Sequence, residues 1–341
     1  MKKTFLHVVL MSLIGFNYVA AQSSLIATLS HENDVKVFYG ASALKEAHEA
    51  AVGGDIITLS SGTFNSVNIT KAITLRGAGM AVDTVNNVMP TILSGDFNIS
   101  ESDSIHNLTM EGLYHNGNMR YSGTLSKAQF IKCRFKSISY SNYYKDYVEC
   151  CTFLNCRVSS YFSCFGSGNM FCNSIIESCC LHGYGSMFYN CVINMSEYGT
   201  PNSMELGPTS CFENCIIVYG GYKSHVFASH VSAYNCIAAG SIIDIFKEVP
   251  NETNIIVRDL SDVFKTYHSV ATIEKNDDET FELTEEAKTK YLGLDGTQVG
   301  IYGGAIPYNT TPAIPKITKC NVAAKSTVDG KLSVDVEVSA E

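Results

Sequence analysis

The chain of 341 residues contains no tryptophan, only 7 prolines and few charged side chains, which make up 17% of the total. Low charge together with 19 tyrosines and 17 phenylalanines excludes global disorder, because disordered chains are highly charged and poor in aromatic residues. The formal net charge is −9, and so acidic a surface repels phosphate backbones, so we expect no nucleic-acid partner. Beyond the first twenty residues no apolar run is long enough to span a membrane, so we expect no transmembrane segment.

The first residues have the pattern of a secretory leader. Lys2 and Lys3 form a basic start, an apolar stretch follows from Phe5 to Val19, and small residues precede a cleavage point near Ala21. We therefore expect residues 1–21 to be a signal peptide and the mature protein to be secreted, periplasmic or at the cell surface. No cysteine follows the leader directly, so no lipid anchor is indicated.

The 13 cysteines are unusual in number and in position. An odd number does not suit a closed set of disulfides, and twelve of the thirteen lie between Cys133 and Cys236. The chain has no pair of CxxC motifs, and its histidines share no spacing with the cysteines. We therefore expect no metal site and no cofactor.

A repeat of about twenty residues explains where the cysteines lie. The sequence of residues 188–193, Phe-Tyr-Asn-Cys-Val-Ile, returns at 212–217 and 233–238, and an earlier copy is found at 171–176. Weaker copies are at 105–110, 130–135, 148–153 and 254–257. This alignment takes residues 108, 133, 151, 174, 191, 215, 236 and 255 as equivalent. Repeats of this length indicate a solenoid.

The repeat itself predicts the kind of solenoid. Its apolar residues are the first, fourth and sixth, and the alternation of the last two is typical of a strand. Asparagine often precedes the cysteine position, where it tolerates a left-handed corner and where stacked side chains can bond between coils. Five cysteines should then point inward as a ladder of free thiols, with disulfides between coils as the alternative: Cys133, Cys151, Cys191, Cys215 and Cys236.

The start of the chain resembles the right-handed parallel β-helix of the pectin-lyase-like family. The resemblance is carried by residues 42–47, the Gly-Gly-Asp-Ile-Ile-Thr-Leu of 53–59, the Gly-Thr-Phe of 62–64 and the Ile-Thr-Leu-Arg-Gly-Ala-Gly of 73–79. It implies an all-β solenoid over about residues 36–306, with a short helix, N-capped by Ser42, that closes the first coil.

Other segments flank this solenoid. Residues 22–35 are a lead-in, 307–315 a linker and 316–341 a β hairpin or tail, in which Val334, Val336 and Val338 alternate with polar residues. The tail is either a hairpin docked on the coils or a strand edge offered to a protein partner.

The family's catalytic motifs are absent. Its hydrolases carry Asn-Thr-Asp, Asp-Asp and Gly-His-Gly motifs, whereas here Asp277 and Asp278 lie in an acidic segment predicted to be a loop, and His182 lacks the preceding glycine. The Arg-x-Pro-x-x-Arg pattern of pectate lyases and a calcium-ligand cluster are also missing. We therefore expect a non-catalytic exported module that binds a glycan or displays a surface. The alternative is a polysaccharide lyase or glycoside hydrolase without a readable motif.

Eight residues are candidates for glycan binding: Tyr140, Tyr143, Tyr144, Tyr147, Lys136, Glu177, His182 and Tyr184. The tyrosines cluster in one segment and offer flat faces on which sugars stack. Lys136 and Glu177 are expected in one outward row with Glu111, Leu154 and Asn194, two coils or roughly 10 Å apart. His182 and Tyr184 occupy a glycine corner. A solvated charged face, and tyrosines that merely cover the core, are the alternatives.

Overall fold

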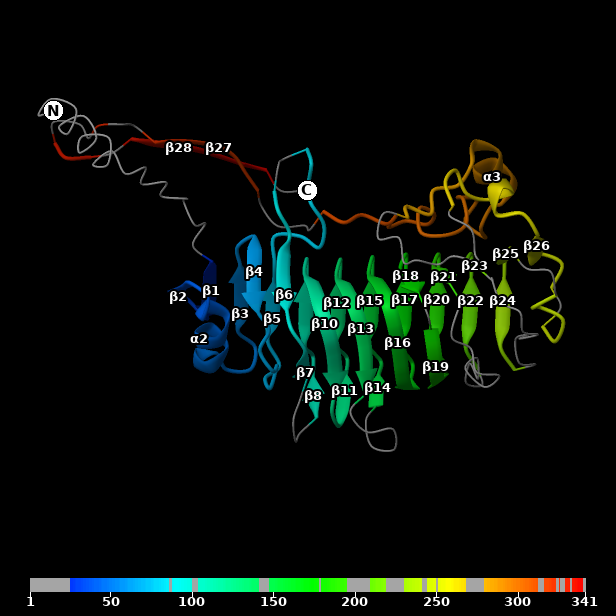
Figure 1. Cartoon of the computed structure of the whole chain (residues 1–341), viewed down its shortest axis with the longest axis horizontal. Helices are drawn as coiled ribbons and strands as arrows, with labels where there is room; N and C mark the ends of the chain where they lie inside the picture. The colour runs from blue at the N-terminus through cyan, green and yellow to red at the C-terminus, as the bar shows by residue number, and fades with distance from the viewer. Residues whose placement is uncertain are drawn as a thin grey trace, which may run out of the picture.

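The computed structural model describes residues 25–85, 88–99, 104–140, 147–177, 179–194, 209–218, 230–240, 244–249, 251–267, 279–311, 316–322, 325, 329–331 and 333–339. These residues form a right-handed parallel β-helix whose coils stack in a row (Figure 1). The predicted fold class is confirmed. The predicted leader, residues 1–21, lies outside the described residues.

Two sheets, A and B, run the length of the stack, and a third, sheet C, is short. In the described part of the chain sheet A has eleven strands: β1 (Ile26–His31), β2 (Asp34–Tyr39), β3 (Ile56–Leu59), β5 (Thr74–Arg76), β9 (Thr109–Glu111), β12 (Gln129–Ile131), β15 (Thr152–Leu154), β17 (Met170–Cys172), β20 (Met187–Tyr189), β22 (Cys211–Glu213) and β24 (Ser232–Tyr234). The exceptions to parallel pairing are β1 and β2, an antiparallel hairpin that extends the sheet from β3.

Sheet B lies on the next side of the coils. It consists of β4 (Gly62–Asn65), β6 (Thr91–Ser94), β7 (Phe97–Ile99), β10 (Tyr114–Tyr121), β13 (Arg134–Tyr140), β16 (Arg157–Ser167), β18 (Ile175–Glu177), β19 (Cys179–Tyr184), β21 (Val192–Asn194), β23 (Ile216–Val218), β25 (Ile237–Ala239) and β26 (Ile255–Val257). Sheet C is the short third side and contains β8 (Ile105–His106), β11 (Thr124–Ser126) and β14 (Tyr147–Glu149).

Two left-handed corners, five residues apart, bracket the short strands of sheet A. The corner before sheet B has positive φ at Asn155, Asn173, Asn190, Asn214 and Asn235, between 45° and 55°. Asparagine tolerates this conformation better than most residues, so the prediction of asparagine corners is confirmed. The corner before sheet A uses more varied residues: Asn107, Lys127, Cys150, Gly168, Gly185 and Thr209.

The existence of two corners corrects the alignment of two coils, and strand pairing corrects a third by one residue: Ile237 pairs with Ile255, so Asn254, not residue 255, is equivalent to Cys236. Backbone hydrogen bonds place Leu113, Cys133 and Cys156 in consecutive coils, so residues 113 and 156, not 108 and 151, are equivalent to Cys133. Leu108 and Cys151 belong to the other corner ladder, with Ala128 between them. Both ladders place a buried residue after a left-handed one, and the sequence pattern alone did not separate them.

The thiol ladder is confirmed in its main feature, burial. Cys133, Cys151, Cys191, Cys215 and Cys236 are completely buried and free, and Cys156 joins them. The Sγ of Cys191 donates to the carbonyl oxygens of Phe171 and Tyr189 at 3.4 and 3.3 Å, a contact repeated at other rungs. Buried thiols that have weak partners behave as small apolar groups.

A stack of phenylalanine rings forms the centre of the core. Phe130, Phe153, Phe171, Phe188 and Phe212 occupy the middle positions of successive sheet A strands, and neighbouring ring centroids lie 4.6 to 4.7 Å apart. Because one strand spacing is about 4.8 Å, the rings stack face to face at the distance that the backbone dictates. The first, fourth and sixth positions of the repeat are therefore core positions, as predicted.

Helix α2 (Ala43–Ala50) closes the first coil, as the resemblance implied (Figure 1). Leu44, Ala47 and Ala51 are buried on one face, and this face covers the open end of the core. Ser42 stands at the N-cap position but makes no cap hydrogen bond; its hydroxyl donates to the carboxylate of Glu46 at 2.5 Å. The predicted position of the helix is right and the predicted cap bond is wrong.

After β26 the chain reverses and runs back along the stack (Figure 1). We call residues 279–311 the return segment. It covers the outer face of sheet B and forms a second hydrophobic core with it: Ile175, Val192, Ile216, Val218, Ile237, Ala239, Val257, Val263, Phe264, Phe281, Leu283, Ala287, Tyr291, Val299 and Ile301. Residues 298–304 lie along the asparagine corner of the solenoid.

Corner asparagines hold the return segment in place. Asn173 donates to the carbonyl oxygens of Ile301 and Gly303, at 2.8 and 2.7 Å. The Oδ1 of Asn214 accepts the N–H of Leu294 at 3.0 Å. These side chains were expected to bond one another between coils. They point outward from the corner and bind the backbone of the return segment instead.

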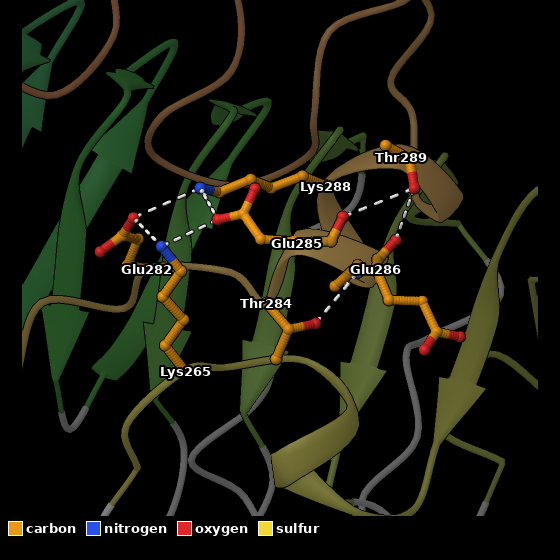
Figure 2. A network of polar contacts seen from close by, with 8 residues as sticks. Lys265, Glu282, Thr284, Glu285, Glu286, Lys288 and Thr289 are labelled. Atoms are coloured by element: carbon orange, nitrogen blue, oxygen red, sulfur yellow. Dashed lines mark hydrogen bonds and ion pairs between the residues drawn. The ribbon is translucent and has the colours of Figure 1, made fainter.

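The acidic stretch predicted to be a loop is not helical over residues 279–284 and leads into a helix, α3 (Glu285–Lys290), with Thr284 as its N-cap. Figure 2 shows how Lys265 and Lys288 alternate with Glu282 and Glu285, at nitrogen–oxygen distances of 2.6 to 3.3 Å. The network ties the helix to the turn that precedes it. Asp277 and Asp278 lie outside the described residues.

The C-terminal strands form a sheet of their own. Strand β27 (Lys316–Val322) pairs antiparallel with β28 (Val334–Ser339), so the predicted hairpin is confirmed. No other strand of the described chain pairs with them, and Val334 and Val336 are 53% and 46% exposed. The hairpin is a separate two-stranded sheet that adds no strand to the stack, and Figure 1 shows it apart from the coils, above their N-terminal end. A protein partner at its edge stays a prediction.

The 307–315 linker is docked in its first part. Tyr308 donates its backbone N–H to Ile301 and packs on the second core, and the carbonyl oxygen of Thr311 accepts from Lys132 at 2.5 Å. Residues 312–315 lie outside the described chain. Among the described residues, no helix has the length and apolar character needed to cross a membrane.

Candidate functional site on sheet C

Sheet C brings polar side chains into two outward rows. Parallel pairing places His106, Ser126 and Glu149 side by side, each directly before a left-handed corner. The second row contains Thr124 and Tyr147. Between the rows lie buried residues of the core: Ile105, Leu125 and Val148. Since side chains of a strand alternate between its faces, the two polar rows share the outer face.

The face continues onto the next coils through the end of β16 and through β19. The backbone N–H of Cys150 donates to the carbonyl oxygen of Ser167 at 2.9 Å, which sets β16 beside β14. Farther along, Ser167 pairs with Tyr184 and Phe165 with His182. The repeat pattern does not indicate that β16, at 11 residues, is long enough to belong to both sheets.

This register aligns residues that are distant in the sequence. In backbone register, Tyr147 and His182 are aligned two coils apart, and so are Glu149 and Tyr184. Two coils correspond to about 10 Å. Gly166 lets the strands approach here, because a Cβ at this position would lie 1.9 Å from the carbonyl oxygen of Val148.

The described side chains of this face suit a ligand with many hydroxyl groups. Nδ1 of His106 contacts the hydroxyl of Ser126, and Glu149 adds a carboxylate one coil farther. His106 is exposed and Tyr147 is 41% exposed, so an aromatic ring and an imidazole stand open to solvent. Together they offer hydrogen-bond donors, acceptors and one stacking surface.

The other predicted residues are placed differently. Tyr140 ends β13, at the edge of sheet B where the chain turns toward sheet C. Tyr143 and Tyr144 lie outside the described residues. Lys136 is exposed on sheet B, at a bulge between β10 and β13, and does not belong to the sheet C face.

The structure contradicts the prediction that Glu177 binds a glycan. Its predicted register two coils beyond Lys136 holds, since Phe135, Val158 and Ile176 pair in sequence. However, Glu177 is only 5% exposed, because the return segment covers this part of sheet B. Its carboxylate pairs with Arg157, and a buried ion pair cannot contact a surface glycan.

Two of the residues expected in the outward row with Lys136 and Glu177 lie on another sheet. Glu111 and Leu154 belong to sheet A, where Glu111 pairs with Arg76 at 3.1 Å. Asn194 is correctly placed next to Glu177. The error follows from the two misaligned coils described above.

Sequence reasoning missed the outer face of sheet A. Its strands carry Tyr189, Glu213 and Tyr234 in one row, and Tyr234 is 43% exposed. A parallel row contains Met170, Met187 and Cys211. The signal was present in the repeat, because the residues around each buried phenylalanine alternate with it and must face outward.

Comparisons with known proteins add no assignment. No protein-family model matches the chain, and neither a curated protein nor a solved structure matches it significantly. Within the described residues, no group of three or more His, Cys, Asp or Glu side chains could hold a metal ion.

Proposed function

We propose that this protein is an exported, non-catalytic module that binds a glycan along the sheet C face. The observation that carries the proposal is the alignment of Tyr147 with His182 and of Glu149 with Tyr184 on a rigid parallel stack. An extended polysaccharide repeats along its length, and residues aligned at a fixed spacing can match such a repeat. The leader at residues 1–21 supports export.

The chemistry of the described side chains supports a sugar ligand. Tyr147 supplies a stacking face, while His106 and Glu149 supply hydrogen bonds to hydroxyl groups, and the buried hydroxyl of Ser126 contacts His106. A neutral or basic glycan fits best, because the net charge of −9 disfavours a polyuronate without added cations.

The test is retention of the mature chain, residues 22–341, on a panel of immobilised polysaccharides. Tyr147→Ala should abolish retention and leave the melting temperature almost unchanged. Tyr39→Ala is the matched control, because Tyr39 is an exposed tyrosine, 63% accessible, on β2 at the far end of the stack. Retention that survives in Tyr147→Ala contradicts the proposed face.

The same incubations distinguish binding from catalysis. Each polysaccharide is assayed for new reducing ends and for unsaturated products that absorb in the ultraviolet. We expect neither, and the appearance of either would replace the binding proposal with a lyase or hydrolase.

A further inference from the structure

Three sulfur-containing side chains occupy consecutive rungs on the outer face of sheet A. Met170 of β17 pairs with Met187 of β20, and Met187 pairs with Cys211 of β22. Neighbouring rungs of a sheet lie about 4.8 Å apart. Met187 is 38% exposed, and Met170 and Cys211 are half-buried, so solvent reaches the row.

Core packing does not account for these residues. The interior positions of the same strands are filled by Phe171, Phe188 and Phe212, whose stacked rings fix the register with interplanar angles of 4° and 2°. Elsewhere along the row, the same outward position holds Thr152 and Ser232. The three sulfurs are thus an outward group on a rigid support.

We propose that Met170, Met187 and Cys211 form a binding site for a soft monovalent metal ion, Cu(I), independent of the glycan face on sheet C. Thioether and thiolate sulfur are the ligands that select Cu(I), whereas hard divalent ions prefer oxygen. The unbranched methionine side chains are flexible enough to turn toward one ion over the central rung. With two methionines and one cysteine, this site differs in kind from a group of three or more His, Cys, Asp or Glu ligands, of which the described residues contain none.

The thiol of Cys211 is a proton donor in this reaction. A thiol is protonated at neutral pH. Binding of Cu(I) replaces the S–H bond by a sulfur–metal bond and releases one proton to solvent, without any change of oxidation state.

A hydrogen bond positions Met187, the central residue of the proposed site. The hydroxyl of Tyr189 donates to Sδ of Met187 at 3.3 Å. This bond holds the thioether on the outer face of the sheet. A sulfur atom has a second lone pair, so the contact leaves an acceptor for the metal.

The experiment is an anaerobic titration of the folded mature chain with Cu(I), in competition with a chromophoric Cu(I) chelator. We expect one equivalent to bind. Cys211→Ser and Met187→Leu should weaken binding by at least about 100-fold and tenfold, since loss of even an outer-shell group lowers metal affinity 10- to 100-fold. Serine is tolerated at this row, as Ser232 shows at the next rung.

Matched variants separate this site from other sulfur. Cys150→Ser removes an exposed free thiol at a corner outside the row, and Met89→Leu removes a methionine that is 57% exposed. Both should bind Cu(I) like the parent chain. Equal loss of binding in these controls, or unchanged binding in Cys211→Ser, overturns the site. Zn²⁺ that competes with Cu(I) at equal concentration also overturns it, because a site with two thioethers does not suit zinc.

Discussion

Arg157 and Glu177 form an ion pair beneath the return segment, one coil apart on the outer face of sheet B. Nη2 of Arg157 lies 2.8 Å from Oε1 of Glu177, and their side chains are 9% and 6% exposed. Nη1 of the same arginine donates to the carbonyl oxygen of Glu279 at 3.1 Å. The pair thus joins two coils to the segment that covers them.

We expect Glu177→Gln to lower the free energy of unfolding by about 3–5 kcal/mol, because it leaves the Arg157 charge buried without its partner. The double variant Arg157→Leu/Glu177→Leu should recover most of this loss, since it removes both charges. Chemical denaturation of the three proteins measures both effects. A single variant that loses less than about 1 kcal/mol would show that solvent reaches the pair.

Cys191→Ser should lower the free energy of unfolding by only about 1 kcal/mol or less. Ser174 stands at the same ladder position, where its hydroxyl donates to the carbonyl oxygens of Phe153 and Cys172 at 3.2 and 2.8 Å. A serine at position 191 finds the equivalent carbonyls of Phe171 and Tyr189. Denaturation measures the cost, and a loss above about 3 kcal/mol would contradict equivalent rungs.

The ladder thiols should resist modification in the native state, whereas Cys150, which is exposed, should react quickly. Burial raises the pKa of Cys133 and Cys151 to about 12, from 9.0. The pKa of these thiols is higher in the folded state than in the unfolded state. The resulting stabilisation of the folded state is therefore fully present below pH 9 and is lost as the pH rises from 9 toward 12. Thiol labelling against time, and melting temperature against pH, check the two statements. Fast labelling of Cys133 would disprove the ladder.

Asn214→Gly should loosen the return segment. Glycine keeps the left-handed φ of 55° but removes the amide that accepts the N–H of Leu294, at a cost of about 1 kcal/mol. Hydrogen exchange within residues 291–304 should become faster. Asn107→Gly is the control, because Asn107 has a φ of 64° at an exposed corner outside the return segment. Equal exchange in both variants would mean that backbone contacts alone hold the segment.

Helix α3 should lose protection against hydrogen exchange in acid, once each rate is divided by the intrinsic exchange rate at that pH. Hydrogen bonds from Lys288 and Lys265 lower the pKa of Glu285 to about 2, and the same lysines lower that of Glu282. Lowered folded pKa values give a stabilisation that is present above pH 4.5 and lost as the pH falls toward 2. Hydrogen exchange of residues 285–290 at pH 6 and pH 3 tests this, with Lys265→Ala as the variant in which the difference shrinks. Both glutamates are exposed, so salt should weaken the effect.

The sequence alone determined the repeat, the fold class and most of the core. A buried phenylalanine, a left-handed asparagine and a buried cysteine recur at fixed offsets, because each coil must bury the same positions and turn at the same corner. The capping helix was also readable, since Leu44, Ala47 and Ala51 lie on one helical face. These are local rules, and they need no knowledge of which coil lies beside which.

Only the tertiary structure decided the surface. The register of two coils depended on which of two similar corners was used, and a shift of five residues moves a side chain from sheet B to sheet A. The burial of Glu177 depended on residues 279–311, more than a hundred positions away, folding back over sheet B. Likewise, Met170, Met187 and Cys211 are neighbours only in the folded chain. The loops between their strands differ in length, so their spacing in the sequence does not show that the stacked strands place them on consecutive rungs. Outward residues make contacts that the repeat does not encode, so their partners follow from packing alone.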